Sequence, residues 1–147
     1  MPRSRRSTRS FLLDNNVFVA AIANPHRMSG TLRLILYLMS GGVRLVGGVY
    51  LAEEMARYSE VYPSETAVWL LMALASKMEI IQVEEKYLKI CRGYLGTDDL
   101  SDIYHAALCL QTDSVLVSDD GHFDGIRDEG IIKVWGTQKA IRKLLGI

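Results

Sequence analysis

Apolar positions recur along the chain in two patterns. Short apolar runs, such as those at 11–13 and 115–117, predict buried strands, whereas longer segments with apolar residues every three or four positions predict amphipathic helices. Turn-forming and capping residues separate the segments: Asn24-Pro25 ends one helix, Ser29 can cap the next, and Pro63 precedes another. The predicted strands span 11–13, 43–48, 79–83, 114–118 and 131–135, and the predicted helices span 17–22, 31–40, 49–58, 64–77, 84–93, 96–111 and 137–145.

Alternation of strands and helices at these lengths is typical of βαβ units, whose parallel sheet is covered by helices on both faces. We therefore predict a three-layer α/β/α sandwich with a central, mainly parallel sheet of four to five strands. The 147 residues fit one domain, and no repeat or linker divides them. We expect a globular domain over residues 11–147, preceded by a basic, flexible arm at 1–10.

The charge of the chain is unevenly distributed. It has 17 basic and 17 acidic residues, and the arm holds four of the basic ones, Arg3, Arg5, Arg6 and Arg9. Without these four, 13 basic residues face 17 acidic ones, so the body carries a net charge of −4. The arm could contact phosphate backbones, or it could be an irregular terminus with no binding role.

The cysteines and the apolar runs bear on where the protein works. Cys91 and Cys109 form no CxxC or Cys/His pattern, which argues against a zinc site and a secreted disulfide framework. The apolar runs are too short or too interrupted to span a bilayer, and no secretory signal begins the chain. We expect a soluble, cytoplasmic protein without a membrane partner.

Carboxylates follow two of the predicted strands. Asp14 comes directly after the first strand, and Asp119 and Asp120 come directly after the strand at 114–118. Ligands of open α/β sheets bind beyond the carboxyl ends of the strands, where the strand order reverses. If these two strands are neighbours, their acids meet.

Further acids lie near the starts of two helices. Asp99 and Asp102 belong to the beginning of the helix at 96–111, and Glu53 and Glu54 belong to the helix that follows the second strand. Two carboxylates about 5 Å apart repel by roughly 3 kcal/mol at an effective dielectric near 20, so such a cluster is unfavourable without a cation or protonation, and a hard divalent ion is the natural partner. Oxygen ligands without Cys or His select Mg²⁺ or Mn²⁺. Such a site can activate water for phosphodiester cleavage.

Three segments resemble motifs of the PIN-domain family, which includes toxin ribonucleases and RNA-processing nucleases. LLDNNVFVAAI resembles its opening strand, acid and helix, SDIYHAAL resembles the helix that bears its third acid, and VLVSDDGHF resembles the strand and loop that bear its fourth. The resemblance covers residues 11–135. It implies a divalent-metal-dependent endoribonuclease that hydrolyses RNA phosphodiester bonds, either a toxin paired with an antitoxin protein or an RNA-processing enzyme.

The resemblance also assigns roles to residues. Asp14, Asp102 and Asp120 match the family's acids, and Glu54 is favoured over Glu53 as the remaining one because an apolar residue follows it. These four are the expected catalytic residues and ligands of Mg²⁺ or Mn²⁺. Further positions follow from the same motifs: Asp119 as an additional metal-site residue, Asn16 and Ser118 as supporting polar residues, and Asp99 and Asp124 as weaker candidates.

Two histidines lie close to these acids. His105 follows Asp102 by one turn of an apolar helix, where a partly buried structural role is expected. His122 follows the acidic loop and could approach a scissile phosphate, although loop histidines are usually solvated. Neither is assigned a role in the site.

Other functions compete with the nuclease. A non-catalytic RNA-binding or assembly module could keep the acids as a structural cation site. A phosphatase could use Asp14 as its nucleophile, but Asn16 stands where such sites carry a second Asp. Many members of the PIN family are homodimers, so the resemblance also implies a homodimer, and the apolar helices between 31 and 77 could supply its interface.

Overall fold

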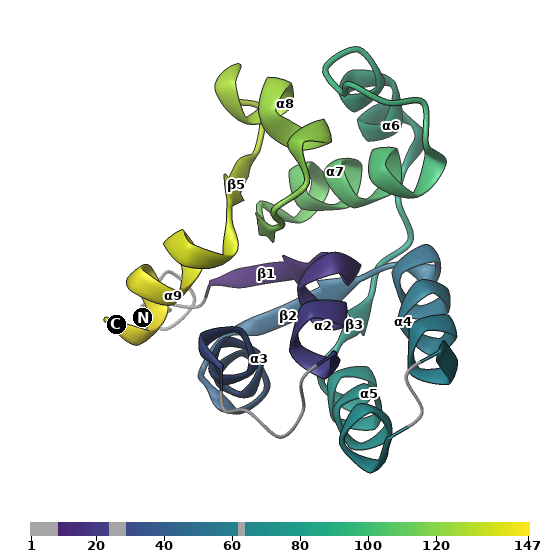
Figure 1. The fold of residues 1–147 in the computed structure, drawn as a ribbon. Coiled ribbons are helices and arrows are strands. Elements are labelled where there is room, and N and C mark those ends of the chain that lie inside the picture. Colours follow the sequence, from purple (N-terminus) through teal and green to yellow (C-terminus); the bar gives the residue numbers. More distant parts are fainter. Residues whose placement is uncertain (1–8, 24–28, 62–63) are drawn as a thin grey trace, which may run out of the picture.

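Five parallel strands form one sheet in the order β3-β2-β1-β4-β5 (Figure 1). The structure is a computed structural model, and it describes residues 9–23, 29–61 and 64–147. Three of the predictions lie outside the described residues: the flexible arm over residues 1–8, the helix end at Asn24-Pro25 and the helix start at Pro63. The strands are β1 (Ser10–Leu13), β2 (Arg44–Gly47), β3 (Glu79–Ile80), β4 (Val115–Val117) and β5 (Lys133–Trp135).

The central strand β1 is enclosed on both faces. Its residues are all buried, and Phe11 lies in register with Leu45 of β2 and Val115 of β4. Successive apolar residues, as at 11–13, are expected in a strand whose sheet is covered on both faces. Ser10 is buried as well, because its hydroxyl forms a 2.7 Å hydrogen bond with the hydroxyl of Ser114.

The helices form the two outer layers. In Figure 1, α6 and α7 lie above the central strands, and α2, α3 and α5 lie below them. Helix α7 contacts β1 and β4 and carries α6 on its outer side, while α9 packs against α3 and β5. This arrangement confirms the predicted three-layer sandwich. The helical elements are α2 (Asn15–Ile22), α3 (Gly30–Ser40), α4 (Val49–Val61), α5 (Glu65–Lys77), α6 (Glu85–Arg92), α7 (Leu100–Thr112), the 3-10 helix η1 (Gly121–Phe123), α8 (Asp124–Asp128) and α9 (Thr137–Leu145).

The predicted elements differ from the observed ones at several places, and the helix expected from 96 begins only at Leu100. The expected strand at 79–83 is paired only over Glu79–Ile80, and the expected loop after β4 contains η1 and α8. These two helices bury Phe123 and Ile126 but are too short to show a helical period in the sequence. Among the described residues, no helix combines the length and apolar character needed to cross a membrane.

The strand order brings the predicted acids together. The chain leaves β1 toward β2 on one side and later returns to place β4 on the other, so the strand order reverses between β1 and β4. The Asp14 amide extends this pairing by donating a 2.9 Å hydrogen bond to the Val117 carbonyl. Acids that follow the two strands therefore share one edge, where open α/β sheets bind ligands.

Candidate metal centre

Asp14 is the most enclosed acid of this edge. The residue is 6% exposed, and its side chain caps α2 by accepting a 2.7 Å hydrogen bond from the Asn15 amide. Its other oxygen accepts a 2.6 Å hydrogen bond from the Ser118 hydroxyl. A carboxylate has about four lone-pair sites, so both oxygens keep capacity for a cation.

Ser118 links the loops that follow β1 and β4. Its hydroxyl donates to Asp14 and accepts a 3.1 Å hydrogen bond from the Asp120 amide, and it is almost fully buried. Its own amide donates to the Trp135 carbonyl at 3.0 Å, which continues the ladder with β5. The side chain thereby fixes Asp14 and Asp120 relative to one another. This arrangement agrees with a supporting role for Ser118.

His122 joins two further acids. Asp120 accepts a 2.9 Å hydrogen bond from the His122 amide, which turns the chain so that the imidazole returns toward the edge. The His122 Nδ1 then lies 3.0 Å from an Asp102 oxygen and 3.3 Å from an Asp120 oxygen. One ligand atom from each of these residues lies within 4.8 Å of the others, close enough to share an ion.

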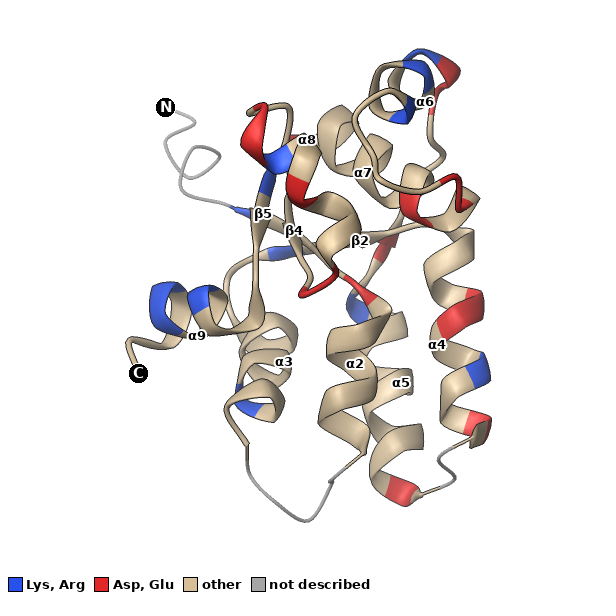
Figure 2. Cartoon of the chain, turned by 45° about the horizontal axis from the view of Figure 1, so that its top comes forward, with Lys and Arg blue, Asp and Glu red and all other residues tan. Residues whose placement is uncertain are grey.

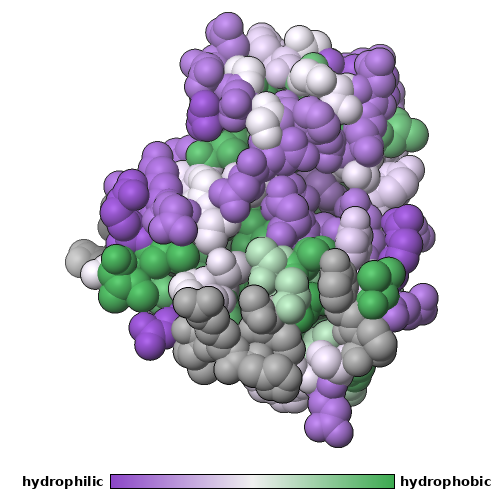
Figure 3. Space-filling view, in the orientation of Figure 1, coloured by the Kyte–Doolittle hydropathy of each residue, from purple (hydrophilic) through white to green (hydrophobic). Residues whose placement is uncertain are grey.

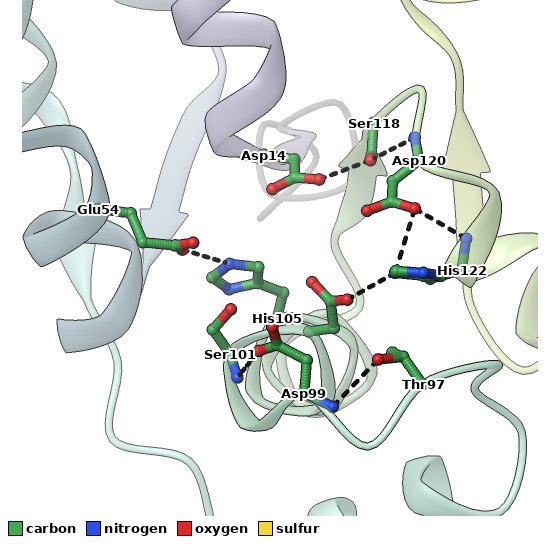
Figure 4. Close-up of polar contacts among 10 residues, drawn as sticks. Asp14, Glu54, Thr97, Asp99, Ser101, His105, Ser118, Asp120 and His122 are labelled. Atoms are coloured by element: carbon green, nitrogen blue, oxygen red, sulfur yellow. Dashed lines mark hydrogen bonds and ion pairs between the residues drawn. The ribbon is translucent and has the colours of Figure 1, made fainter. Parts of the chain in front are cut away.

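Glu54 approaches the same space from α4. Its Oε1 lies 3.2 Å from Nε2 of His105, which is 2% exposed and projects from α7 (Figure 4). Figure 4 shows Asp14, Glu54 and Asp120 facing one another from three different elements. Helix α4 and helix α7 pack together, so this contact fixes Glu54 against the body of the domain.

A depression of about 310 Å³ lies between these side chains. Figure 2 shows acidic residues on the elements that surround it, whereas the Lys and Arg residues of α9 lie elsewhere. In Figure 3, hydrophilic residues dominate the part of the surface formed by α6, α7 and α8. The polar residues that line the depression include Asp14, Asn15, Asn16, Glu54, Asp99, Asp102, Asp120 and His122.

Asn15 carries a buried oxygen without a hydrogen-bond partner among the described residues. This atom is the side-chain amide oxygen, Oδ1. Leaving such a group unpaired costs about 1–3 kcal/mol, so an unpaired oxygen in a residue that lines the acidic depression points to a missing partner. Together with the carboxylates it makes an oxygen-rich donor set that fits Mg²⁺ or Mn²⁺.

The electrostatics of the metal-free site are unfavourable. Burial raises the pKa of the Asp14 carboxyl above its ordinary value, although the hydrogen bond from Ser118 opposes this shift. Burial also raises the pKa of Asp102, and the nearby charges of other acids add to the increase. The hydrogen bond to Asp102 and the charge of Asp120 raise the pKa of His122. A divalent cation would favour the ionised forms of the Asp14 and Asp102 carboxyls.

The structure separates the remaining candidates. Glu53 is exposed and does not line the depression, in contrast to Glu54. Asp119 is turned away, because its two oxygens accept hydrogen bonds from the amide and hydroxyl of Thr137 at the start of α9. Its expected place in the metal set therefore does not match this geometry. Asp124 pairs with Arg127 at 3.4 Å on the surface of α8.

Asp99 and Asn16 line the depression without being bonded to its acids. Asp99 caps α7 by accepting a 2.8 Å hydrogen bond from the Ser101 amide, and hydrogen bonds from Ser101 lower its pKa. Asn16 is exposed at the rim, which is compatible with its expected supporting role. The buried neighbour Asn15 was not singled out from the sequence, because an Asn-Asn pair does not show which amide faces inward.

Both histidines contact acids of the site directly, which the sequence did not predict. His105 is buried, as expected, but it contacts Glu54, which lies on another helix and 51 positions earlier in the sequence. No local spacing reveals such a pair. His122 had a usable signal, because an Asp that accepts from an amide two residues later forms a turn. That turn returns the imidazole to the acids.

Among known proteins, the chain is similar to several solved structures. No protein-family model and no curated protein sequence matches the chain. VapBC2 from Rickettsia felis, bound to a DNA fragment from their promoter, is 18% identical with a TM-score of 0.62, over 86% of this chain and 98% of that one. VapBC-1 from nontypeable Haemophilus influenzae is 16% identical with a TM-score of 0.61, over 88% and 99%. PAE2754 from Pyrobaculum aerophilum is 12% identical with a TM-score of 0.58, over 95% and 99%.

These likenesses extend over nearly the whole of each solved chain, so they concern the complete domain and not one motif. The sheet order, its helical layers and the acids at its carboxyl edge define a parallel α/β domain with a candidate cation site. The fold is that of the PIN domain, as the three sequence motifs predicted.

Proposed function

We propose that the protein is a divalent-metal-dependent endoribonuclease. The observation that carries this proposal is the convergence of four acids from separate elements on one depression, which is also lined by Asn15, a residue with an unpaired buried oxygen. Like charges gathered in this way are unfavourable unless a cation joins them. The choice of RNA as substrate is supported by the PIN-domain fold and by the motif resemblance.

Asp14, Glu54, Asp102 and Asp120 would hold Mg²⁺ or Mn²⁺. When bound, the ion supplies neutralising charge for a phosphodiester and lowers the pKa of a water molecule that attacks phosphorus. Ser118 keeps Asp14 oriented, and His105 keeps Glu54 oriented, through the hydrogen bonds described above. Preorganised ligands of this kind lose little free energy to rearrangement when substrate binds.

The geometry disfavours covalent attack by Asp14. Its carboxylate is buried and accepts hydrogen bonds at both oxygens, from Asn15 and Ser118. Such bonds stabilise an anion in place and reduce its nucleophilicity, which suits a ligand better than the nucleophile of a phosphatase. Hydrolysis would then proceed by direct attack of water, with no phosphorylated protein.

We also propose a protein partner for α5. Val68, Trp69 and Met72 on this helix are about half or more exposed and form an apolar surface beside α4. Exposed apolar residues that gather in this way are typical of association sites. An antitoxin-type protein or a second copy of the chain would cover them, in line with the resemblance to PIN toxins. Mass measurement by light scattering, with Trp69→Ser as the variant, tests the second copy.

The nuclease is tested with a pool of unstructured RNA oligonucleotides in Mg²⁺, Mn²⁺ or EDTA. The variant is Asp14→Asn/Asp120→Asn, and the matched control is Asp113→Asn/Asp128→Asn, whose substituted residues lie outside the depression. Asn tolerates the left-handed backbone of Asp113, where φ is 54°. All proteins are purified in parallel, and circular dichroism checks their folds.

We expect metal-dependent cleavage by wild type and control, and a loss of at least about 100-fold in the double variant. Equal cleavage by both double variants would reveal a contaminating ribonuclease and refute the assignment. Tight RNA binding without any metal-dependent cleavage would instead favour the non-catalytic RNA-binding module.

A further inference from the structure

A second cavity lies behind the metal centre, between the first turn of α4, the segment that follows β3, and α7. Its volume is about 200 Å³. Tyr50 and Tyr104 form one wall, with ring centroids 4.9 Å apart and an interplanar angle of 56°. Ile81, Val83 and Leu108 contribute apolar surface, and none of the lining residues is Lys, Arg, Asp or Glu.

The cavity and the metal centre share His105. His105 lines the cavity, and its Nε2 lies 3.2 Å from the Glu54 carboxylate. Tyr50 and Glu54 are one helical turn apart on α4, so the Tyr50–Tyr104 and Glu54–His105 contacts are successive contacts of one helix pair. One residue, His105, therefore belongs both to the cavity and to the contact that holds a proposed metal ligand.

The wall that follows β3 is held in place. The Gln111 side chain on α7 accepts a 2.9 Å hydrogen bond from the Glu84 amide and donates a 3.1 Å hydrogen bond to the Gln82 carbonyl. These two bonds fix the segment 81–84 against α7, so the cavity is preformed. The exposed Gln82 side chain at its edge offers both a donor and an acceptor.

We propose that this cavity binds a nucleobase of the RNA, next to the phosphate that is cut. Its volume is below the roughly 300–1,000 Å³ of sites for drug-sized ligands, which suits a single planar ring system. Aromatic walls bind bases by stacking, and the lack of cationic residues makes the cavity a poor site for phosphate. Gln82 would hydrogen-bond to the edge of the base and so influence which base is accepted.

Adjacency to a scissile phosphate rests on the proposed nuclease function, whereas base binding does not. Base binding is therefore measured first on the full chain in EDTA, by titrating adenosine, guanosine, cytidine and uridine and following the protein by nuclear magnetic resonance. The variants are Tyr50→Leu, which removes one stacking ring, and Val83→Trp, which fills the cavity and keeps both tyrosines. Tyr94→Leu is the control, because Tyr94 is an exposed tyrosine outside the cavity.

We expect at least one nucleoside to bind saturably to wild type and to Tyr94→Leu, with affinity at least about fivefold weaker in Tyr50→Leu and in Val83→Trp. Absence of saturable binding to wild type, or equal affinity in all folded variants, would overturn the proposal. A change of oligomeric state in Tyr50→Leu with unchanged nucleoside binding would also overturn it and would make the tyrosines an interface between copies.

The second measurement uses RNA with one abasic nucleotide placed in turn on either side of the mapped cleavage site. We expect one placement to raise KM for wild type by at least about fivefold and to leave KM of Tyr50→Leu unchanged. Equal abasic effects on wild type and Tyr50→Leu would overturn the link to the cut phosphate. If wild type cuts no RNA but binds a nucleoside through Tyr50, the nuclease assignment fails and the base site stands.

Discussion

Asp102→Asn replaces a carboxylate of the acidic depression by a group of nearly the same shape. Asp102 and Asp120 offer oxygens within 4.8 Å of one another, which corresponds to a repulsion of roughly 3 kcal/mol at an effective dielectric of about 20. The His122 ring between the two acids and the surrounding water offset part of this repulsion. We therefore expect the variant to be more stable than wild type in EDTA, by about 1 kcal/mol or a Tm rise of about 3 °C for a domain of this size.

The sign of the pH dependence follows from the pKa direction. The pKa of Asp102 is raised in the folded protein, so its ionised form costs stability. Metal-free wild type should lose stability relative to the variant as pH rises from below the unfolded pKa of Asp through the higher folded pKa. The difference should be complete at neutral pH.

Cation binding should reverse the order. An ion at 100 times its Kd stabilises the folded state by about 2.7 kcal/mol, or a Tm rise of about 5–10 °C. Asp102→Asn lacks one ligand and should gain much less. Differential scanning calorimetry in EDTA and in Mn²⁺ measures both states, with Asp128→Asn, an exposed residue of α8, as the control. A variant that is less stable in EDTA, or that gains as much as wild type from Mn²⁺, would refute the reasoning.

Three further variants separate the roles of neighbouring residues. Ser118→Ala should reduce cleavage at least about tenfold and cost about 1–2 kcal/mol in urea unfolding, because a buried acceptor and donor lose their partner; unchanged cleavage would contradict its positioning role. Glu54→Gln should weaken Mn²⁺ binding in calorimetry by at least about tenfold, whereas Glu53→Gln should leave it unchanged, and the opposite result would exchange their assignments. Asp119→Ala should cost about 1 kcal/mol of stability through the start of α9 and leave Mn²⁺ affinity unaltered, and a loss of affinity would restore it to the metal set.

The strand pattern predicted the parallel sheet and placed Asp14 and Asp120 at its carboxyl edge, whereas the pairing of β1 with β4, on which their meeting depends, came from the structure. A buried parallel strand is apolar throughout, and the acid that follows it must lie at its carboxyl edge. What the pattern could not show is side-chain direction beyond the strand end. Asp119 and Asp120 are adjacent in sequence, yet one caps α9 and the other faces the depression.

Contacts between helices that are distant in the sequence could not be predicted either. His105 and Glu54 meet because α7 and α4 pack together, and the angle of that packing depends on the whole core. The Tyr50–Tyr104 cavity arises from the same helix pair and has no motif in the sequence. Short elements such as η1 and α8 were missed because a few residues do not establish a period.

Direct contact between the proposed ion and the cut phosphate is tested most sharply by sulfur substitution. One nonbridging oxygen of the mapped scissile phosphate is replaced by sulfur, and each stereoisomer is incubated with the protein in Mg²⁺ and in Mn²⁺. Mg²⁺ prefers oxygen ligands more strongly than Mn²⁺ does. If the acids hold the ion against the phosphate, one stereoisomer should be cut much more slowly in Mg²⁺ and should recover in Mn²⁺. Equal rates for both stereoisomers and the unmodified RNA, in both metals, would contradict a metal centre that acts on RNA.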